Sequence, residues 1–353
     1  MKHTIICAVL LLVAPAHGQD APWSVFGQVG ALTGGTSNLE QTQEGSGEAL
    51  MQIEGSAWAQ GFDRRLRIQG NGSFRQPLTG AELRQGRGHL TVDYGHPLAD
   101  GFEIGASSRL AATEQVVLFN EAGVLPRGRS RRSIGGRTRP RVAWTQGPWR
   151  LEVDALLSRK GVSGADDFHF TDLGGGGAVR WSQSPDLWVR VFSEGFQRQF
   201  DQFLARDRFG DFREESPTLS LAMTDFGVEL GSAPDDVVQV NGRLVARRTW
   251  DTFDGFHSGW RVSAEGGLSW VPERRLNLDL GGWASQRTYH RRQSSPGVPT
   301  SEFESGGWLS MGWRLPRGLM PQVRYEANAA FTDVDAALYT EHVLLMGVQM
   351  LMQ

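Results

Sequence analysis

The chain has 353 residues, a formal net charge of -3, one cysteine (Cys7), 45 glycines and 39% hydrophobic residues. No apolar run beyond the N-terminus approaches the roughly 18 residues that a membrane-spanning helix needs, which excludes a protein that crosses a membrane with several helices. A single cysteine excludes a scaffold held together by disulfides, and the nearly neutral charge gives no reason to expect a nucleic-acid partner.

The N-terminus has the pattern of a secretory signal peptide. Lys2 precedes an apolar stretch over 5–13 that is too short to span a bilayer, and small residues follow it as they do at a cleavage site. We therefore predict a cleaved signal peptide over 1–18 and a single mature domain over 19–353, which contains no cysteine and so suits an oxidising compartment.

From Trp23 onward, polar and apolar residues alternate in segments that are separated by Gly, Pro, Asp and Asn. This is the period of a β-strand whose two faces meet different surroundings. In the segment 65–75, for example, odd positions such as Arg67 are polar and even positions such as Ile68 are apolar or Gly. The pattern predicts sixteen strands, at 23–32, 48–60, 64–75, 87–96, 102–113, 137–146, 149–159, 174–183, 187–198, 217–230, 237–249, 259–271, 275–288, 303–314, 320–331 and 342–352.

The connections between these strands alternate between short and long. Every other connection, counted from the second strand, is a tight turn such as 146–148, whereas intervening ones such as 114–136 and 199–216 are mostly long. All long loops then leave one end of the sheet. We predict an all-β transmembrane antiparallel up-and-down β-barrel of about 16 strands, with 18 as the alternative, short periplasmic turns and long extracellular loops. A soluble propeller would repeat a blade signature about every 40 residues, and none is present.

Over 19–353 the chain resembles the porin-sized outer-membrane barrels of Gram-negative bacteria, in architecture more than in any motif. A weaker likeness, carried by the segment 34–39, an acidic loop and the Arg-rich segment 64–67, is to barrels associated with exopolysaccharide secretion. The resemblance implies an outer-membrane location, contact with outer-membrane lipid and lipopolysaccharide, insertion by the barrel-assembly machinery and, for an exporter, periplasmic polysaccharide-export components. Such barrels usually end in an aromatic residue, whereas this chain ends in Gln353.

Aromatic residues near the predicted strand ends suit the interfacial girdles of a membrane barrel. They are Trp23, Trp144, Trp149, Trp188, Trp270, Trp313 and Tyr325.

The polar face of the predicted strands would line the lumen and carries seventeen basic positions against nine acidic ones. Such a channel would favour anions. The alternative is that arginines pair with acids on neighbouring strands and brace the wall. Predicted substrate-path residues are Arg65, Arg67, Arg109, Arg139, Arg141, Arg150, Arg190, Arg243 and Arg261, with Trp58, Trp283 and Trp308 as surfaces on which sugars stack.

The third long loop, 114–136, carries the arginines Arg127, Arg129, Arg131 and Arg132. In porins the third external loop commonly folds into the barrel and sets its constriction, so the resemblance suggests this role here. The alternatives are a loop that binds lipopolysaccharide phosphates and a solvated loop.

No catalytic, metal or cofactor site is predicted. A hydrolytic site needs a base, usually His, beside a nucleophile, and neither His89 beside Asp93 nor any other histidine of the mature chain has an arguable third partner. We therefore predict that the protein is not an enzyme. We expect an outer-membrane channel that exports an anionic exopolysaccharide. The alternatives are a passive, anion-preferring diffusion porin and a structural or adhesive barrel.

Overall fold

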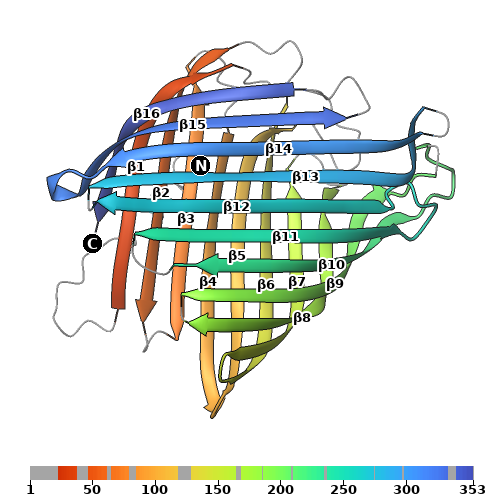
Figure 1. Cartoon of the computed structure of the whole chain (residues 1–353). Coiled ribbons are helices and arrows are strands. Elements are labelled where there is room, and N and C mark those ends of the chain that lie inside the picture. The colour runs from red at the N-terminus through yellow and green to blue at the C-terminus, as the bar shows by residue number, and fades with distance from the viewer. Residues whose placement is uncertain are drawn as a thin grey trace.

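The computed structural model describes residues 23–37, 47–61, 65–78, 85–117, 129–163, 168–184, 186–207, 210–233, 237–273, 275–295, 298–332 and 339–352. They form one closed barrel in which every strand pairs antiparallel with its neighbours in the sequence, and the first strand pairs with the last (Figure 1). The predicted strand number and topology are confirmed. The predicted signal peptide over 1–18 lies outside the described residues. No helix among the described residues is long and apolar enough to cross a membrane.

The strands are β1 (Trp23–Thr36), β2 (Glu48–Gly61), β3 (Leu66–Pro77), β4 (Gln85–Ala99), β5 (Phe102–Val117), β6 (Arg129–Gln146), β7 (Trp149–Val162), β8 (Phe170–Ser184), β9 (Leu187–Leu204), β10 (Thr218–Ser232), β11 (Val238–Asp251), β12 (Gly259–Glu273), β13 (Leu276–Ser295), β14 (Val298–Trp313), β15 (Leu319–Thr332) and β16 (Tyr339–Met352). In Figure 1 the strands of the near wall run across those of the far wall, as expected when strands tilt strongly against the barrel axis.

Several strands extend beyond their predicted ends, and the largest extensions lie on the side of the long loops. β6 begins at Arg129 instead of 137, β9 continues to Leu204 instead of 198, and β13 continues to Ser295 instead of 288. The extension of β9 carries Phe200 and Phe203, whereas those of β6 and β13 are mostly polar, as in the sequence Arg-Ser-Arg-Arg-Ser that opens β6. A strand that projects into water needs no apolar face, so the alternation that reveals the membrane-spanning part is absent there.

The two faces of the barrel differ sharply. Val153, Val191 and Phe226 are more than half exposed and point outward. Residues that alternate with them along the same strands, such as Glu152 and Arg190, point to the inner side of the barrel, which we call the lumen face. The side chains of Glu152 and Arg190 pair with each other there. An apolar outer face on a sheet that has no free edge is the arrangement that a lipid bilayer requires.

Aromatic side chains mark the outer face at both ends of the strands. At the short-turn end, Trp23, Trp144, Trp149, Trp270 and Trp313 share the outward face, as predicted for a girdle.

Trp188 is an exception to the predicted girdle, because it lies on the lumen face. A Cβ atom added at Gly231 of β10 would lie 2.6 Å from its ring, and the guanidinium of Arg180 lies 4.6 Å from the ring centroid. Trp188 is the second residue of its predicted strand, so the sequence alternation did not fix which face its side chain occupies. A shift of one residue moves a side chain to the opposite face.

Candidate functional site: the channel lumen

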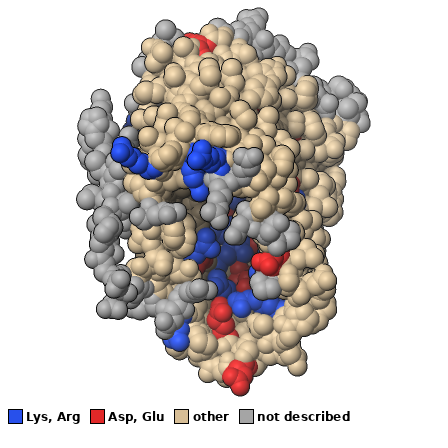
Figure 2. Space-filling model, turned by 60° about the vertical axis from the view of Figure 1, so that its left-hand side comes forward, with Lys and Arg blue, Asp and Glu red and all other residues tan. Residues whose placement is uncertain are grey.

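The interior of the barrel is hollow and charged. Figure 2 shows basic and acidic side chains gathered within a hollow, while most of the visible outer surface around it carries neither. The strand register places these side chains on the lumen face, so the candidate site is the wall of a channel.

Arginines of β6 pair with acids of the following strands. The guanidinium of Arg139 lies 2.7 Å from a carboxylate oxygen of Asp154 on β7 and also pairs with Glu194 on β9. Arg137 lies 3.2 Å from the same Glu194. One acid therefore holds two arginines, and β6 is tied to a strand three positions away.

The ladder continues around the wall to β12. Arg190 and Arg243 approach the two carboxylate oxygens of Glu229 at 2.9 and 3.2 Å. Arg247 donates two hydrogen bonds of 2.7 Å to the carboxylate of Asp225. Such bidentate pairs are the strong form of the interaction. Most arginines of this part of the wall have acidic partners on neighbouring strands, as the bracing alternative expects, whereas Arg180 of β8 donates to Ser182.

A second group of charges bridges the seam where the chain's first and last strands meet. Arg75 of β3 lies 2.8 Å from Glu326 of β15, and Arg324 of β15 lies 3.4 Å from Glu54 of β2. These side chains reach across β1 and β16, where the lumen face carries Gly30 beside Gln349. They stabilise the closure of the barrel.

The positive excess on the lumen face is smaller than the sequence predicted. Three of the acids on it, Asp172, Glu302 and Glu341, lie beyond the predicted strand ends, where the alternation could not be followed. Further lumen-face acids that the prediction left out are Asp225, Glu229 and Glu304. These six acids reduce the predicted excess, although Arg87 and Lys160, which the prediction also left out of the lumen face, restore part of it.

Among the described residues, two neighbouring arginines without an acidic partner lie on the lumen face of β4 and β5, while Arg180 of β8 is another such arginine and donates to Ser182. Arg87 donates a hydrogen bond of 3.2 Å to Ser73, Arg109 contacts Nδ1 of His89 at 3.1 Å, and His89 contacts Asn71 at 2.9 Å. Within the described part of the chain neither arginine is paired with a carboxylate, and both are exposed to the lumen. We call Arg87, His89 and Arg109 the cationic patch.

Sequence reasoning found only part of this patch. Arg109 was predicted, whereas Arg87 was missed because it opened its predicted strand, and His89 was considered only as a catalytic base. Register is the signal that joins them, because Arg87, His89 and Asp93 alternate along one face of β4.

Two tryptophans form a flat aromatic surface on the lumen face of β13 and β14. A Cβ atom added at Gly281 would lie 2.1 Å from the ring of Trp308, and one added at Gly306 would lie 2.7 Å from Nε1 of Trp283. Each ring therefore lies against the wall over a glycine of the neighbouring strand. We call Trp283 and Trp308 the aromatic platform.

The third predicted tryptophan, Trp58, stacks on Phe26 with ring centroids 4.6 Å apart.

In the order of the closed sheet, β13 lies eight strands from β5. The aromatic platform and the cationic patch therefore occupy roughly opposite walls of the lumen.

The remaining predicted path residues are placed as follows. Arg67, Arg141, Arg150 and Arg261 are on the lumen face, where Arg150 lies 3.0 Å from Glu103. Arg65 lies in the turn before β3 and not in a strand.

The third loop is shorter than predicted, since β5 and β6 leave only 118–128 between them. Arg127 lies outside the described residues, and Arg129 and Arg131 are strand residues of β6. Arg132 lies 3.2 Å from Glu114 on the outward face of the barrel. The prediction that it belongs to a constriction loop is therefore wrong.

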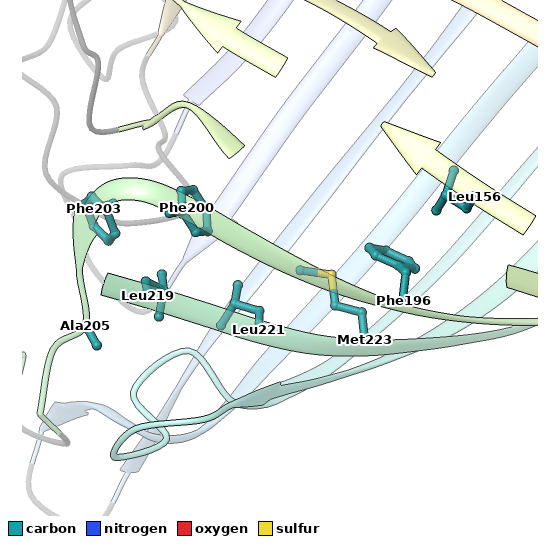
Figure 3. Packing of buried hydrophobic residues seen from close by; sticks show 8 residues of the cluster. All are labelled: Leu156, Phe196, Phe200, Phe203, Ala205, Leu219, Leu221 and Met223. Carbon is teal, nitrogen blue, oxygen red and sulfur yellow. The ribbon is translucent and has the colours of Figure 1, made fainter. Parts of the chain in front are cut away.

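A different pair of loops packs at the external opening. The residues Leu156, Phe196, Phe200, Leu219, Leu221 and Met223 are buried although they belong to the lumen face. In Figure 3 this cluster lies along the β9–β10 hairpin and continues around the bend of the chain that carries Phe203 and Ala205. Apolar side chains thus fill one side of the opening.

The β9–β10 and β11–β12 loops are joined above this cluster. Arg213 lies 3.2 Å from Asp207 in its own loop and 3.5 Å from Asp254 in the other. A Cβ atom added at Gly210 would lie 3.0 Å from the ring of Phe256. The contacts make these two loops one packed unit at the mouth of the channel.

No family model and no curated protein matches the chain. Similar solved structures include CdiB from Acinetobacter baumannii (10% identity, TM-score 0.49, 94% of this chain and 60% of that chain). Others are outer-membrane expressed OmpT of Vibrio cholerae (9%, 0.42, 94% and 97%) and a bacterial polysaccharide outer membrane secretin (9%, 0.41, 93% and 98%). This chain spans less than two thirds of CdiB, and at these scores the likenesses carry no argument about substrate or partners.

The closed topology, the apolar outer face and the charged lumen face are together the arrangement of a barrel that spans a lipid bilayer. The chain is a porin-sized, closed β-barrel of sixteen antiparallel strands.

Proposed function

We propose that the channel conducts an anionic polysaccharide across the outer membrane and has no enzymatic role. The observation that carries the proposal is the pairing of two unlike surfaces in one lumen. The cationic patch has no carboxylate among its described contacts, and the aromatic platform lies on the opposite side of the strand order.

The chemistry of the two surfaces suits an acidic sugar polymer. Arginine binds carboxylate, phosphate or sulfate through its planar, multiply donating guanidinium. Asn71, Ser73 and Thr91 lie on the same face beside the patch and present groups that can hydrogen-bond to hydroxyls. A flat indole gives a sugar ring an apolar surface on which to stack, and Trp283 is 38% exposed. A small inorganic anion would bind to the cationic patch alone and would make no use of the stacking surface of the aromatic platform.

The test is single-channel recording of the refolded barrel in planar bilayers, with an oligouronate and a neutral malto-oligosaccharide of equal length as probes. We expect anion selectivity and block of the current by the oligouronate at lower concentration than by the neutral oligomer. Replacing both patch arginines (R87Q with R109Q) removes about two charge-assisted contacts, which should raise the blocking concentration of the oligouronate about tenfold or more. The matched control, Arg159→Gln, removes a cation from the outer face and should change neither property.

The aromatic platform separates the two channel functions. Trp283→Ala should weaken block by both oligomers without changing the reversal potential, because it removes stacking and no charge. An anion-selective channel that neither oligomer blocks would be the passive diffusion porin instead. A channel without anion selectivity whose block is equal for both probes would refute the proposal.

A further inference from the structure

Arg248 differs from the other arginines described here because it faces outward within an aromatic girdle. It lies on β11, where its register partners are Thr224 and Trp260. The strand alternation puts it on the same face as Leu244, which is 52% exposed, so this is the lipid-facing side. The position is three residues from the end of β11 at the extracellular side of the barrel.

The guanidinium of Arg248 is held between two indoles. Its carbon lies 5.4 Å from the ring centroid of Trp250 and 5.1 Å from that of Trp260, and both tryptophans are more than 40% exposed. A cation over the face of an indole is attracted by the ring's negative face, and exposed tryptophans mark the boundary between lipid and water. The charge is therefore fixed at the level of the lipid headgroups.

A second basic side chain completes the cluster. Nη1 of Arg248 contacts Nε2 of His290, which reaches it from β13 across β12. Within the described part of the chain Arg248 contacts no carboxylate. Two other outward arginines at this end are neutralised, since Arg132 pairs with Glu114 and Arg159 pairs with Asp201.

A guanidinium at the edge of the hydrocarbon region is stable only with a counter-charge or water. The counter-charge absent from the protein can come from the surrounding lipid. A phosphate group fits because it accepts two parallel hydrogen bonds from one guanidinium, and the flanking indoles contact the acyl chains next to it. We propose that Arg248, Trp250, Trp260 and His290 form a binding site for the phosphorylated headgroup of an outer-leaflet lipid.

The experiment compares lipid A with dephosphorylated lipid A on the whole refolded barrel in neutral detergent, by native mass spectrometry. The wild type should retain lipid A and hold the dephosphorylated form at least about tenfold more weakly. Arg248→Gln should lower the affinity for lipid A about tenfold and leave that for the dephosphorylated form unchanged. Arg159→Gln is the matched control, since it removes an outward arginine that already has an acid, and it should bind as the wild type does.

Further arms keep the proposal testable. Should Arg248→Gln fail to fold, His290→Gln removes the imidazole that accepts from Arg248 without touching the strand pairing and should also weaken lipid A binding selectively. An excess of inorganic phosphate should not displace lipid A, because the free ion lacks the acyl chains that contact the indoles. Equal retention of the two lipids by the wild type, unchanged binding in Arg248→Gln, or displacement by free phosphate would each overturn the assignment.

Discussion

Glu194 is the acid whose loss best separates the two roles of charge in the lumen, which are bracing the wall and attracting anions. It holds Arg137 and Arg139 together, and its side chain is only 11% exposed. Glu265 offers a matched comparison on the same face, because it also pairs with an arginine, Arg243 at 3.5 Å, but is 59% exposed. Changing either one to glutamine keeps the shape of the side chain and removes one negative charge.

The expected losses of stability follow from burial. Removing one partner of a buried ion pair costs about 3–5 kcal/mol, because the other charge stays in a poor solvent. Arg139 keeps Asp154 at 2.7 Å and Arg137 is 45% exposed, so both retain part of their stabilisation. We therefore expect Glu194→Gln to lower the free energy of unfolding by about 2 kcal/mol. For Glu265→Gln we expect less than about 1 kcal/mol, as for an exposed pair.

The assay is equilibrium urea unfolding of the barrel in lipid vesicles, followed by tryptophan fluorescence. With a slope of about 2 kcal/mol per molar urea, Glu194→Gln shifts the midpoint by about 1 M and Glu265→Gln by less than half of that. Both variants should increase anion selectivity in planar bilayers, since both leave one more uncompensated arginine in the lumen. Equal midpoints for the two variants would refute the argument that the buried pairs brace the wall.

Three further results are expected. Gly281→Ala should weaken oligosaccharide block, because its Cβ atom would lie 2.1 Å from the ring of Trp308, whereas Gly136→Ala, where nothing lies within 4 Å, should leave block unchanged in the same recordings. Asp254→Asn removes the ion pair of 3.5 Å with Arg213, which joins the two packed external loops, and should increase the fluctuations of the single-channel current. Fluctuations equal to those of the wild type would contradict a role for this ion pair at the mouth of the barrel. Anion selectivity should fall between 0.1 and 1 M salt, because the screening length shrinks from about 10 to about 3 Å; a selectivity independent of salt would argue against an electrostatic origin.

The sequence was sufficient for the membrane-spanning part of the fold because the bilayer imposes a strict alternation there. Every predicted strand overlaps an observed one, from 23–32 within β1 to 342–352 within β16. The extensions of β6 and β13 could not be predicted, because both faces of a strand are wet above the membrane and hydropathy then carries no period. In the extension of β9 the buried residues Phe200 and Phe203 lie three positions apart and follow no strand alternation. The same loss of signal hid Asp172, Glu302 and Glu341 from the lumen.

The site was less predictable than the fold, since pairing depends on register between strands and not on residues within one strand. Alternation alone places Arg139 and Arg109 on the same face. Only the side-chain positions in the folded barrel show that Arg139 meets Asp154 and Glu194, whereas Arg109 meets His89. Likewise, Trp283 and Trp308 were predicted as lumen residues, but the glycines that receive their rings lie on the partner strands.

The anion selectivity that we propose depends on this distribution of partners and not on the total charge of the lumen. An arginine and a carboxylate 3 Å apart act on a distant solute as a dipole, whose potential falls faster with distance than that of a single charge. The many paired arginines of β6 to β12 therefore hold the wall in shape and contribute little to the field in the channel. Arg87 and Arg109 keep the full range of a single charge, because their contacts are neutral. We therefore expect lumen-face arginines without an acidic partner, such as Arg87 and Arg109, to set the direction of selectivity. Adding an acid beside these two should change the selectivity more than removing any paired arginine of the ladder.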